Sequence, residues 1–306
     1  MIDTFQQTLP HGITLSCRAA GERGRPVLLF LHGFPEAAFV WDELLAHFAK
    51  PEHGGYRCVA PNLRGFEKSS APAEVAAYRA KPLVQDLTAL IKVITQDSPT
   101  PGQLACLVAH DWGGALAWSV AAQHPAAMRR LAIVNAPHPA TFQRELANSP
   151  TQQASSAYMN FLARPDAPAL LAENDFARLW PFFTNMAADS GPMAWLDEAT
   201  RERYREVWRQ GLQGPCAYYA ASPLRPPTAG DAGAAAVQLP RERVTVNVPT
   251  LVVWGLGDTA LPEALLDGLD DFVPDLRIER MPGATHWIVH EQPQQVAELI
   301  GDFVKA

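Results

Sequence analysis

Cysteine is scarce in this chain, and its four copies are not paired. Cys17, Cys58, Cys106 and Cys216 are scattered over 306 residues with no C-x-x-C spacing. Three of them lie in strand-like or apolar runs, where a small buried thiol is the usual explanation. We therefore expect no disulfide framework, no metal site and no metal cofactor.

The chain also lacks an excess of positive charge and lacks long apolar runs. Its 25 Lys and Arg residues are outnumbered by 32 Asp and Glu residues, which gives a formal charge of −7 and argues against a nucleic-acid partner. The opening MIDTFQQTLPHG has no basic segment followed by an apolar one, and no apolar stretch reaches about 18 residues. The expectation is a cytoplasmic protein with no membrane partner.

In the chain, short β-rich runs alternate with helical segments. Such alternation predicts right-handed crossovers and a mostly parallel sheet with helices on both faces. The alternation stops near residue 138, where Ala- and Leu-rich helical segments interrupted by prolines begin. It resumes near residue 247. We expect an α/β fold in three parts: core 1–137, helical lid 138–246 and core 247–306. Expected strands are TLSCRA, VLLFLHG, YRCVAPN, LACLVAH, RRLAIVNA, VPTLVVWG and DLRIERM; expected helices begin near Trp41, 81, 115, 262 and Pro293.

The stretch LACLVAHDWGG, residues 104–114, predicts a strand that turns sharply into a helix with Asp111 at the corner. Asp111 could simply be a helix N-cap. However, the small residues Ala109, Gly113 and Gly114 are what a very tight turn needs. This is the pattern of a nucleophile elbow, with Asp in the place where esterases carry Ser.

Partners for such a nucleophile follow other expected strands. Asp258 comes after TLVVWG, and His286 comes after LRIERM, so both should reach the same sheet edge as Asp111. The order nucleophile, acid, histidine is that of the α/β-hydrolase arrangement. The turn HGFP follows another strand, and we expect the backbone N–H groups of Phe34 and Trp112 to form an oxyanion hole.

The segments HGFPE, APNLRGFEKSS, VAHDWGG, NAPHP and GATHW resemble the epoxide hydrolase branch of the α/β-hydrolase superfamily, and the resemblance covers essentially the whole chain. It implies two lid tyrosines that hydrogen-bond the epoxide oxygen, matched by Tyr158 and Tyr219, with Tyr218 as the fallback. Asn62 and Glu67 depart from the family's usual Asp and Gly. The substrate pocket is expected to include further residues: His32, Pro35, His110, Trp180 and Trp287.

The resemblance implies covalent catalysis in two steps without a cofactor. Asp111 opens the epoxide and forms an alkyl ester, and water activated by His286 and Asp258 hydrolyses that ester. Serine would instead form an ether that water could not cleave. The expected partners are a small apolar or aromatic epoxide and water, because the lid is rich in aromatic side chains. A homodimer is compatible with the sequence.

Other functions fit some of the same residues. A haloalkane or haloacid dehalogenase would use the same Asp nucleophile, but Phe34 stands where haloalkane dehalogenases usually carry a polar donor, and no cation lies beside Asp111 for a haloacid. A small-molecule receptor without catalysis would not need a complete triad. A zinc site at His286 and His290 lacks the metalloprotease helix and Glu, and WGLGD is a weak dinucleotide motif.

Overall fold

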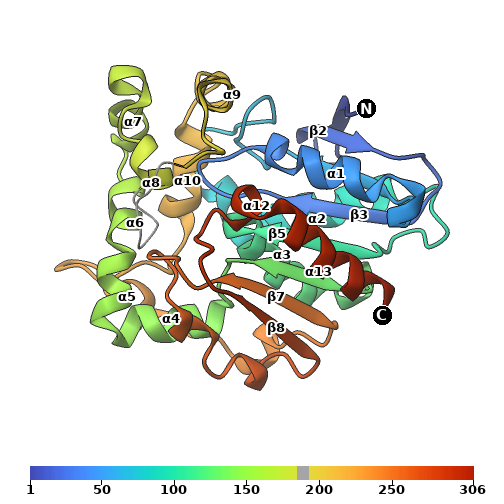
Figure 1. Ribbon diagram of the computed structural model, residues 1–306. Helices are drawn as coiled ribbons and strands as arrows, with labels where there is room; N and C mark the ends of the chain where they lie inside the picture. Colours follow the sequence, from blue (N-terminus) through green and yellow to red (C-terminus); the bar gives the residue numbers. More distant parts are fainter. Residues whose placement is uncertain (185–192) are drawn as a thin grey trace.

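The computed structural model describes residues 1–184 and 193–306 of the chain. Within this part, eight strands form one sheet in the order β1-β2-β4-β3-β5-β6-β7-β8. Strands β1 and β2 run antiparallel to their neighbours, and the other pairs are parallel (Figure 1). The strands are β1 (Asp3–Thr8), β2 (Thr14–Ala20), β3 (Val27–Leu31), β4 (Arg57–Pro61), β5 (Cys106–His110), β6 (Leu131–Val134), β7 (Thr250–Gly255) and β8 (Leu276–Met281).

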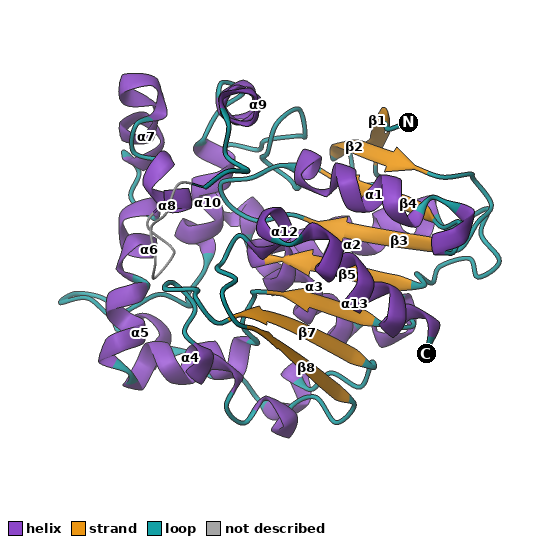
Figure 2. Ribbon diagram, viewed as in Figure 1, coloured by secondary structure: helices purple, strands orange, loops and turns teal. Residues whose placement is uncertain are grey.

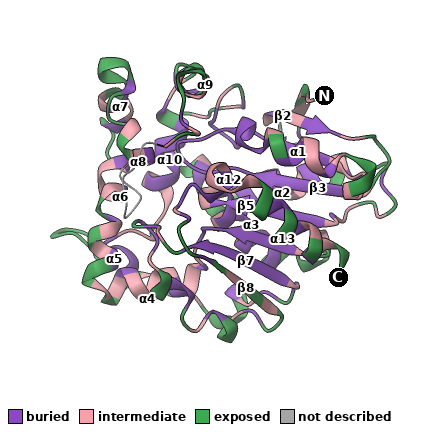
Figure 3. Ribbon diagram, viewed as in Figure 1, coloured by how far each residue is buried: buried purple, intermediate pink, exposed green. Residues whose placement is uncertain are grey.

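The central strands are buried on both faces, which is why their sequences are nearly continuous apolar runs. In β3, Phe30 packs into one hydrophobic cluster, and Leu29 and Leu31 pack into the cluster on the opposite face. Figure 3 shows the central strands buried, whereas the outer ends of several helices are exposed. The strands therefore form the middle layer of a three-layer protein.

Helices cover both faces of the sheet, as predicted. Helices α1 (Asp42–Phe48), α12 (Ile288–Glu291) and α13 (Pro293–Lys305) contribute to one hydrophobic cluster. Helices α2 (Ala80–Ile94) and α3 (Asp111–Gln123) contribute to the other. Figure 2 shows these two layers with the sheet between them.

A set of helices is inserted between β6 and β7, which confirms the predicted helical lid before the last two strands. Figure 1 shows these helices beyond the carboxyl ends of the parallel strands. Residues 185–192 of the predicted lid lie outside the described residues, and the division of the chain at 138 and 247 into domains stays a prediction. The inserted helices are α4 (Pro139–Asn148), α5 (Pro150–Ser155), α6 (Ala157–Leu162), α7 (Ala167–Phe176), α8 (Trp180–Thr184), α9 (Glu198–Trp208), α10 (Gln213–Ala221) and α11 (Arg241–Val244).

Two elements differ from the sequence-based expectation. Strand β1 was not expected because its sequence DTFQQT is polar, which suits an edge strand with a largely exposed face. The helix expected near 262–271 is instead two short 3₁₀ helices, Glu263–Leu266 and Leu269–Asp271. Between them Gly268 has φ +69°, a left-handed conformation that interrupts a regular helix.

In the part of the chain that the structure describes, no helix combines the length and the apolar character needed to cross a membrane. The cytoplasmic location and the homodimer stay predictions.

Candidate active site

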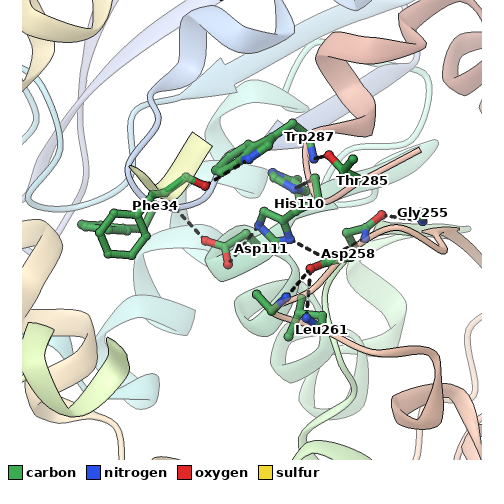
Figure 4. Close-up of polar contacts among 12 residues, drawn as sticks. Phe34, His110, Asp111, Gly255, Asp258, Leu261, Thr285 and Trp287 are labelled. Carbon is green, nitrogen blue, oxygen red and sulfur yellow. Dashed lines mark hydrogen bonds and ion pairs between the residues drawn. The ribbon is translucent and has the colours of Figure 1, made fainter. Parts of the chain in front are cut away.

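The predicted catalytic residues follow the carboxyl ends of four strands. Phe34 follows β3, Asp111 follows β5, Asp258 follows β7 and His286 follows β8. Because these strands are parallel, their carboxyl ends share one edge of the sheet. The fold therefore brings together four residues that are far apart in the sequence. Phe34, Asp111 and Asp258 are labelled in Figure 4.

Asp111 stands on a tight strand-to-helix corner. Its φ of +49° lies in the left-handed region, which is sparsely populated by residues other than glycine. A Cβ atom on Gly113 would lie 2.6 Å from the carbonyl oxygens of Leu31 and His32, so this position needs glycine. The N-cap of α3 is His110 rather than Asp111. The Asp111 carboxylate is thus not used to cap its own helix.

The side chains of Asp111, His286 and Asp258 form a continuous chain. Nδ1 of His286 hydrogen-bonds Oδ2 of Asp258 at 2.7 Å. On the other side of the ring, Nε2 of His286 lies 3.8 Å from Oδ2 of Asp111. This separation is too long for a direct hydrogen bond. The arrangement fits a base that is oriented by Asp258 and faces the carboxylate of Asp111.

Asp258 is itself held by three further donors. Its Oδ1 accepts hydrogen bonds from the backbone N–H groups of Ala260 and Leu261, each at 2.9 Å. Nδ2 of Asn135 donates to Oδ2 of Asp258 at 2.8 Å, and Oδ1 of Asn135 accepts from the N–H of Gly255 at 2.9 Å. Asn135 was not predicted from the sequence, although it stands in the quoted segment NAPHP directly after β6.

The charges around His286 favour its protonated form. Burial by itself lowers the pKa of His286, but the carboxylates of Asp258, Asp111 and Glu36 outweigh this effect and raise the pKa to about 9. Esterification of Asp111 would remove one of these charges. His286 would then release its proton more readily, which is the property that a general base needs at that stage.

The backbone N–H of Phe34, one of the two predicted oxyanion donors, lies next to Asp111. Its backbone N–H donates to Oδ1 of Asp111 at 2.7 Å. The indole of Trp112 lines the adjacent cavity, and its ring lies edge-on to Tyr219 with centroids 5.1 Å apart. The oxyanion roles of the Phe34 and Trp112 backbone N–H groups stay predictions.

Both predicted lid tyrosines line the same cavity as Asp111, which has a volume of about 260 Å³. Burial raises the pKa of Tyr219, as do neighbouring Tyr158 and Asp111. Burial also raises the pKa of Tyr158, and the carboxylates of Asp111 and Asp258 raise it further. Both hydroxyls therefore keep their protons at neutral pH. The fallback residue Tyr218 donates its hydroxyl to the carbonyl of Arg64 at 2.9 Å, so this hydroxyl is already used.

Five other residues were expected in the pocket, but none of them is among the described residues that line the cavity: His32, Pro35, His110, Trp180 and Trp287. The expectation for these five is corrected accordingly. Their polar atoms hydrogen-bond to other groups of the protein, or their rings pack on other aromatic rings.

Three of these five residues take part in contacts with the inserted helices α8 and α9. The carbonyl of Pro35 accepts from Nε1 of Trp208 at 2.7 Å, and the ring of Trp180 packs on that indole with centroids 4.7 Å apart. Trp287 donates its indole N–H to the carbonyl of Phe182 at 3.2 Å. These contacts join the lid to the sheet edge.

The neutral side chain of His32 links two backbone groups at the HGFP turn. The N–H of Leu63 donates to Nε2 of His32 at 3.0 Å, so the proton is on Nδ1, which donates to the carbonyl of Gly33 at 2.9 Å. Burial lowers the pKa of His32 to about 4, in agreement with this neutral form.

A buried acid that was not singled out from the sequence, Glu36, lies near the predicted catalytic residue His286. Glu36 is fully buried, and its Oε2 is 3.1 Å from Nδ1 of His110, whose Nε2 hydrogen-bonds the carbonyl oxygen of His286 at 2.9 Å. Both partners of His110 are acceptors, so each of its ring nitrogens donates. Oε1 of Glu36 contacts His290 at 2.6 Å and accepts from the Tyr204 hydroxyl at 3.0 Å.

This environment keeps Glu36 ionised. Burial raises the pKa of Glu36, but the positive charges and hydrogen bonds of His290 and His110 outweigh burial and hold that pKa well below its usual range. An acid within the otherwise apolar GFPEAAFV is the signal that could have identified it. His290 thus bonds to Glu36, and the described residues contain no cluster of three or more His, Cys, Asp or Glu side chains placed to hold a metal ion.

The two residues that depart from the family pattern bond to each other. Nδ2 of Asn62 donates to Oε2 of Glu67 at 2.8 Å, and Oδ1 of Asn62 accepts from the N–H of Ala38. Both residues line a second, more polar cavity of about 320 Å³ beside α9. None of the predicted site residues is among the described residues that line this second cavity.

Comparison with known proteins agrees with this geometry. Residues 26–293 match the alpha/beta hydrolase fold family. The chain is 34% identical to epoxide hydrolase 3 of Xenopus tropicalis, over 96% of this chain and 75% of that protein. It is 32% identical to the AB hydrolase superfamily protein YfhM of Bacillus subtilis, over 96% of each chain.

The structure of this chain superposes on a solved structure with a TM-score of 0.85. That structure is described as one of the novel epoxide hydrolases of the alpha/beta hydrolases superfamily in metagenomes from hot environments. It is 33% identical to this chain, and the match covers 99% of both. The chain therefore belongs to the epoxide hydrolase branch of the α/β-hydrolase superfamily.

Proposed function

We propose that this protein hydrolyses small apolar or aromatic epoxides to vicinal diols through a covalent ester on Asp111. The observation that carries this proposal is that Asp111, Tyr158 and Tyr219 line one cavity. A carboxylate nucleophile and two protonated phenols are the groups that ring opening of an epoxide requires.

In the first step, Oδ2 of Asp111 attacks a ring carbon while the carbon–oxygen bond of the epoxide breaks. This choice of oxygen is supported by the hydrogen bond that Oδ1 already accepts from Phe34. Tyr158 and Tyr219 donate hydrogen bonds to the leaving oxygen, and one phenolic proton neutralises it. Loss of the Asp111 charge lets the protonated His286 release its proton, which returns through solvent to the phenolate, so that His286 is neutral when the second step begins. The product of this step is a hydroxyalkyl ester of Asp111.

In the second step, His286 takes a proton from a water molecule, and the resulting hydroxide attacks the ester carbonyl of Asp111. Asp258 holds the ring of His286 through the 2.7 Å hydrogen bond and stabilises the imidazolium that forms. The backbone N–H groups of Phe34 and Trp112 stabilise the tetrahedral oxyanion. Collapse of this intermediate releases the diol and restores the carboxylate.

The experiment that tests this function compares styrene oxide, a bromoalkane and fluoroacetate as substrates, with diol and halide release measured separately. We expect diol from the epoxide. In the double variant Tyr158→Phe/Tyr219→Phe, single-turnover ring opening should fall steeply, because each lost donor to a developing oxyanion costs about 2.7–4 kcal/mol. The two losses should not be additive, because one tyrosine can partly replace the other.

A dehalogenase is the second candidate because the indole of Trp112 lines the same cavity and could hold a halide. Halide is a weakly basic leaving group that does not need a phenolic proton. Halide release that is lost in Trp112→Phe but unaffected by the double tyrosine change would replace our proposal with this alternative.

A further inference from the structure

The cavity follows one face of α3 away from the nucleophile. Asp111, Trp112, Ala115, Leu116 and Ser119 all line it. These positions recur at intervals of three to four residues, which places them on one side of a helix. At 1.5 Å rise per residue, the cavity extends about 12 Å along α3 from Asp111.

Apart from Asp111 and the hydroxyl groups of Tyr158 and Tyr219, this cavity is lined mainly by apolar side chains. Asp111 is the one charged side chain among the described residues that line it. Two serine hydroxyls are turned to the backbone: Ser119 donates to the carbonyl of Ala115, and Ser222 accepts from the N–H of Leu224. The other lining side chains come from α2, the inserted helices and loops, and include Leu83, Phe142, Met159, Val237, Leu239 and Leu261.

The ring of Phe34, whose backbone N–H bonds to Asp111, belongs to a cluster of packed aromatic rings. The ring of Phe34 meets Phe182 edge-on with centroids 5.4 Å apart and meets Tyr219 at 5.2 Å. Tyr158 meets Phe182 at 5.5 Å. Such edge-to-face contacts are a favoured packing of aromatic rings. Neither Phe34 nor Phe182 is among the described residues that line the cavity, which therefore extends from Asp111 along α3 and not toward these two rings.

We propose that the site selects epoxides with substituents on one ring carbon only, and that the single apolar substituent lies along α3 in contact with Ala115 and Leu116. A trans-disubstituted epoxide would direct its second substituent against Phe182 and is excluded. This inference rests on the proposed epoxide hydrolysis and specifies its substrate class.

A matched substrate pair tests the inference. 1,2-Epoxyoctane and trans-2,3-epoxynonane carry the same hexyl chain, and the second has one additional methyl group on the other ring carbon. The lower reactivity of the substituted carbon and the cost of overpacking a filled site, about 1–3 kcal/mol, both act against the second epoxide. We expect kcat/KM to be at least about 100-fold lower for trans-2,3-epoxynonane.

The variant Phe182→Ala separates sterics from intrinsic reactivity. It removes the ring that closes the second side and keeps the backbone carbonyl that Trp287 uses. We expect it to reduce the discrimination between the two epoxides at least about 10-fold. The control is Phe161→Ala, another half-buried lid phenylalanine, which is not among the rings packed on Phe34 and should leave the ratio unchanged.

The variant Ala115→Phe tests the α3 side, because Ala115 lies one helical turn beyond the nucleophile. It should lower kcat/KM for 1,2-epoxyoctane at least about 10-fold more than it lowers kcat/KM for 1,2-epoxypropane, whose substituent is a single methyl group. Equal rates for the matched pair in the wild type, or a ratio that Phe182→Ala does not change, would overturn the inference while leaving epoxide hydrolysis intact. Absence of diol from every epoxide would overturn the proposed function instead.

Discussion

The backbone N–H of Phe34 donates to Oδ1 of Asp111 at 2.7 Å, whereas Oδ2 of the same carboxylate faces Nε2 of His286 at 3.8 Å. The two oxygens of the nucleophile therefore have different environments. Oδ1 accepts from the predicted oxyanion donor, and in the proposed reaction Oδ2 is the oxygen that attacks. This asymmetry would let one carboxylate serve in both steps of the proposed reaction.

Replacement of Asp111 by Asn should abolish turnover without unfolding the protein. Asn is among the residues that tolerate the left-handed conformation at φ +49°, so the corner should persist. Loss of the carboxylate removes the covalent route, and we expect kcat to fall by about 10⁴-fold or more. Diol formation and circular dichroism are the measurements, and intact mass checks that the introduced amide has not deamidated. Retention of near-normal activity would contradict the nucleophile assignment.

Replacement of His286 by Gln should stop the reaction after the first step. Ring opening needs Asp111 and the tyrosines, but ester hydrolysis needs the base, whose loss typically costs about 10²–10⁴-fold. Mass spectrometry should detect the substrate-derived ester on the peptide that carries Asp111.

Isotope labelling provides the complementary measurement for the wild type. In H₂¹⁸O, a single turnover should place ¹⁸O in the Asp111 carboxylate, because water attacks the ester carbonyl. Label that appears only in the diol after one turnover would show direct attack of water on the epoxide.

The stability of the protein should depend on His286 in a defined pH range. Its pKa is about 9 in the folded protein, above the ordinary value of about 6.5 expected for the unfolded chain. Between these values the folded state binds the additional proton, so the contribution is complete below about pH 6.5 and is lost as pH rises through about 9. The raised pKa of His286 contributes about 3 kcal/mol to the free energy of unfolding.

Urea unfolding of the wild type and of His286→Gln at pH 6 and pH 10 measures this contribution. The difference in the free energy of unfolding between the two proteins should be smaller at pH 10, because the proton of His286 has then been released. A difference that is constant with pH would refute the assignment of the raised pKa.

Replacement of Glu36 by Gln should destabilise the protein strongly. The change removes a buried negative charge that contacts His110 and His290, and breaking such a buried pair typically costs about 3–5 kcal/mol. The matched control is Glu43→Gln, at an exposed glutamate that hydrogen-bonds Gln294 and should change stability by less than about 0.5 kcal/mol. Equal midpoints of denaturation for the two variants would show that the buried contacts contribute little.

Much of the fold could be predicted because its signals are local. The apolar runs that became β3 and β5 are buried on both faces, so their sequences are distinctive. The corner at Asp111 was also predictable, since a following Gly113 is required by the approach of Leu31 and His32. Strand β1 was not, because a polar edge strand has no such pattern.

The amino-acid sequence alone determines the succession of strands and helices and the residues that stand at the carboxyl ends of the strands. Chain direction and apolar patterning are properties of short segments, so they can be read without the tertiary structure. Three-dimensional packing was needed to place Asn135 against Asp258, to bury Glu36 beneath His110, and to direct the cavity along α3. These contacts join segments up to 254 residues apart, as between Glu36 and His290. Their formation depends on how the lid and the helices pack, and no spacing along the chain encodes that packing.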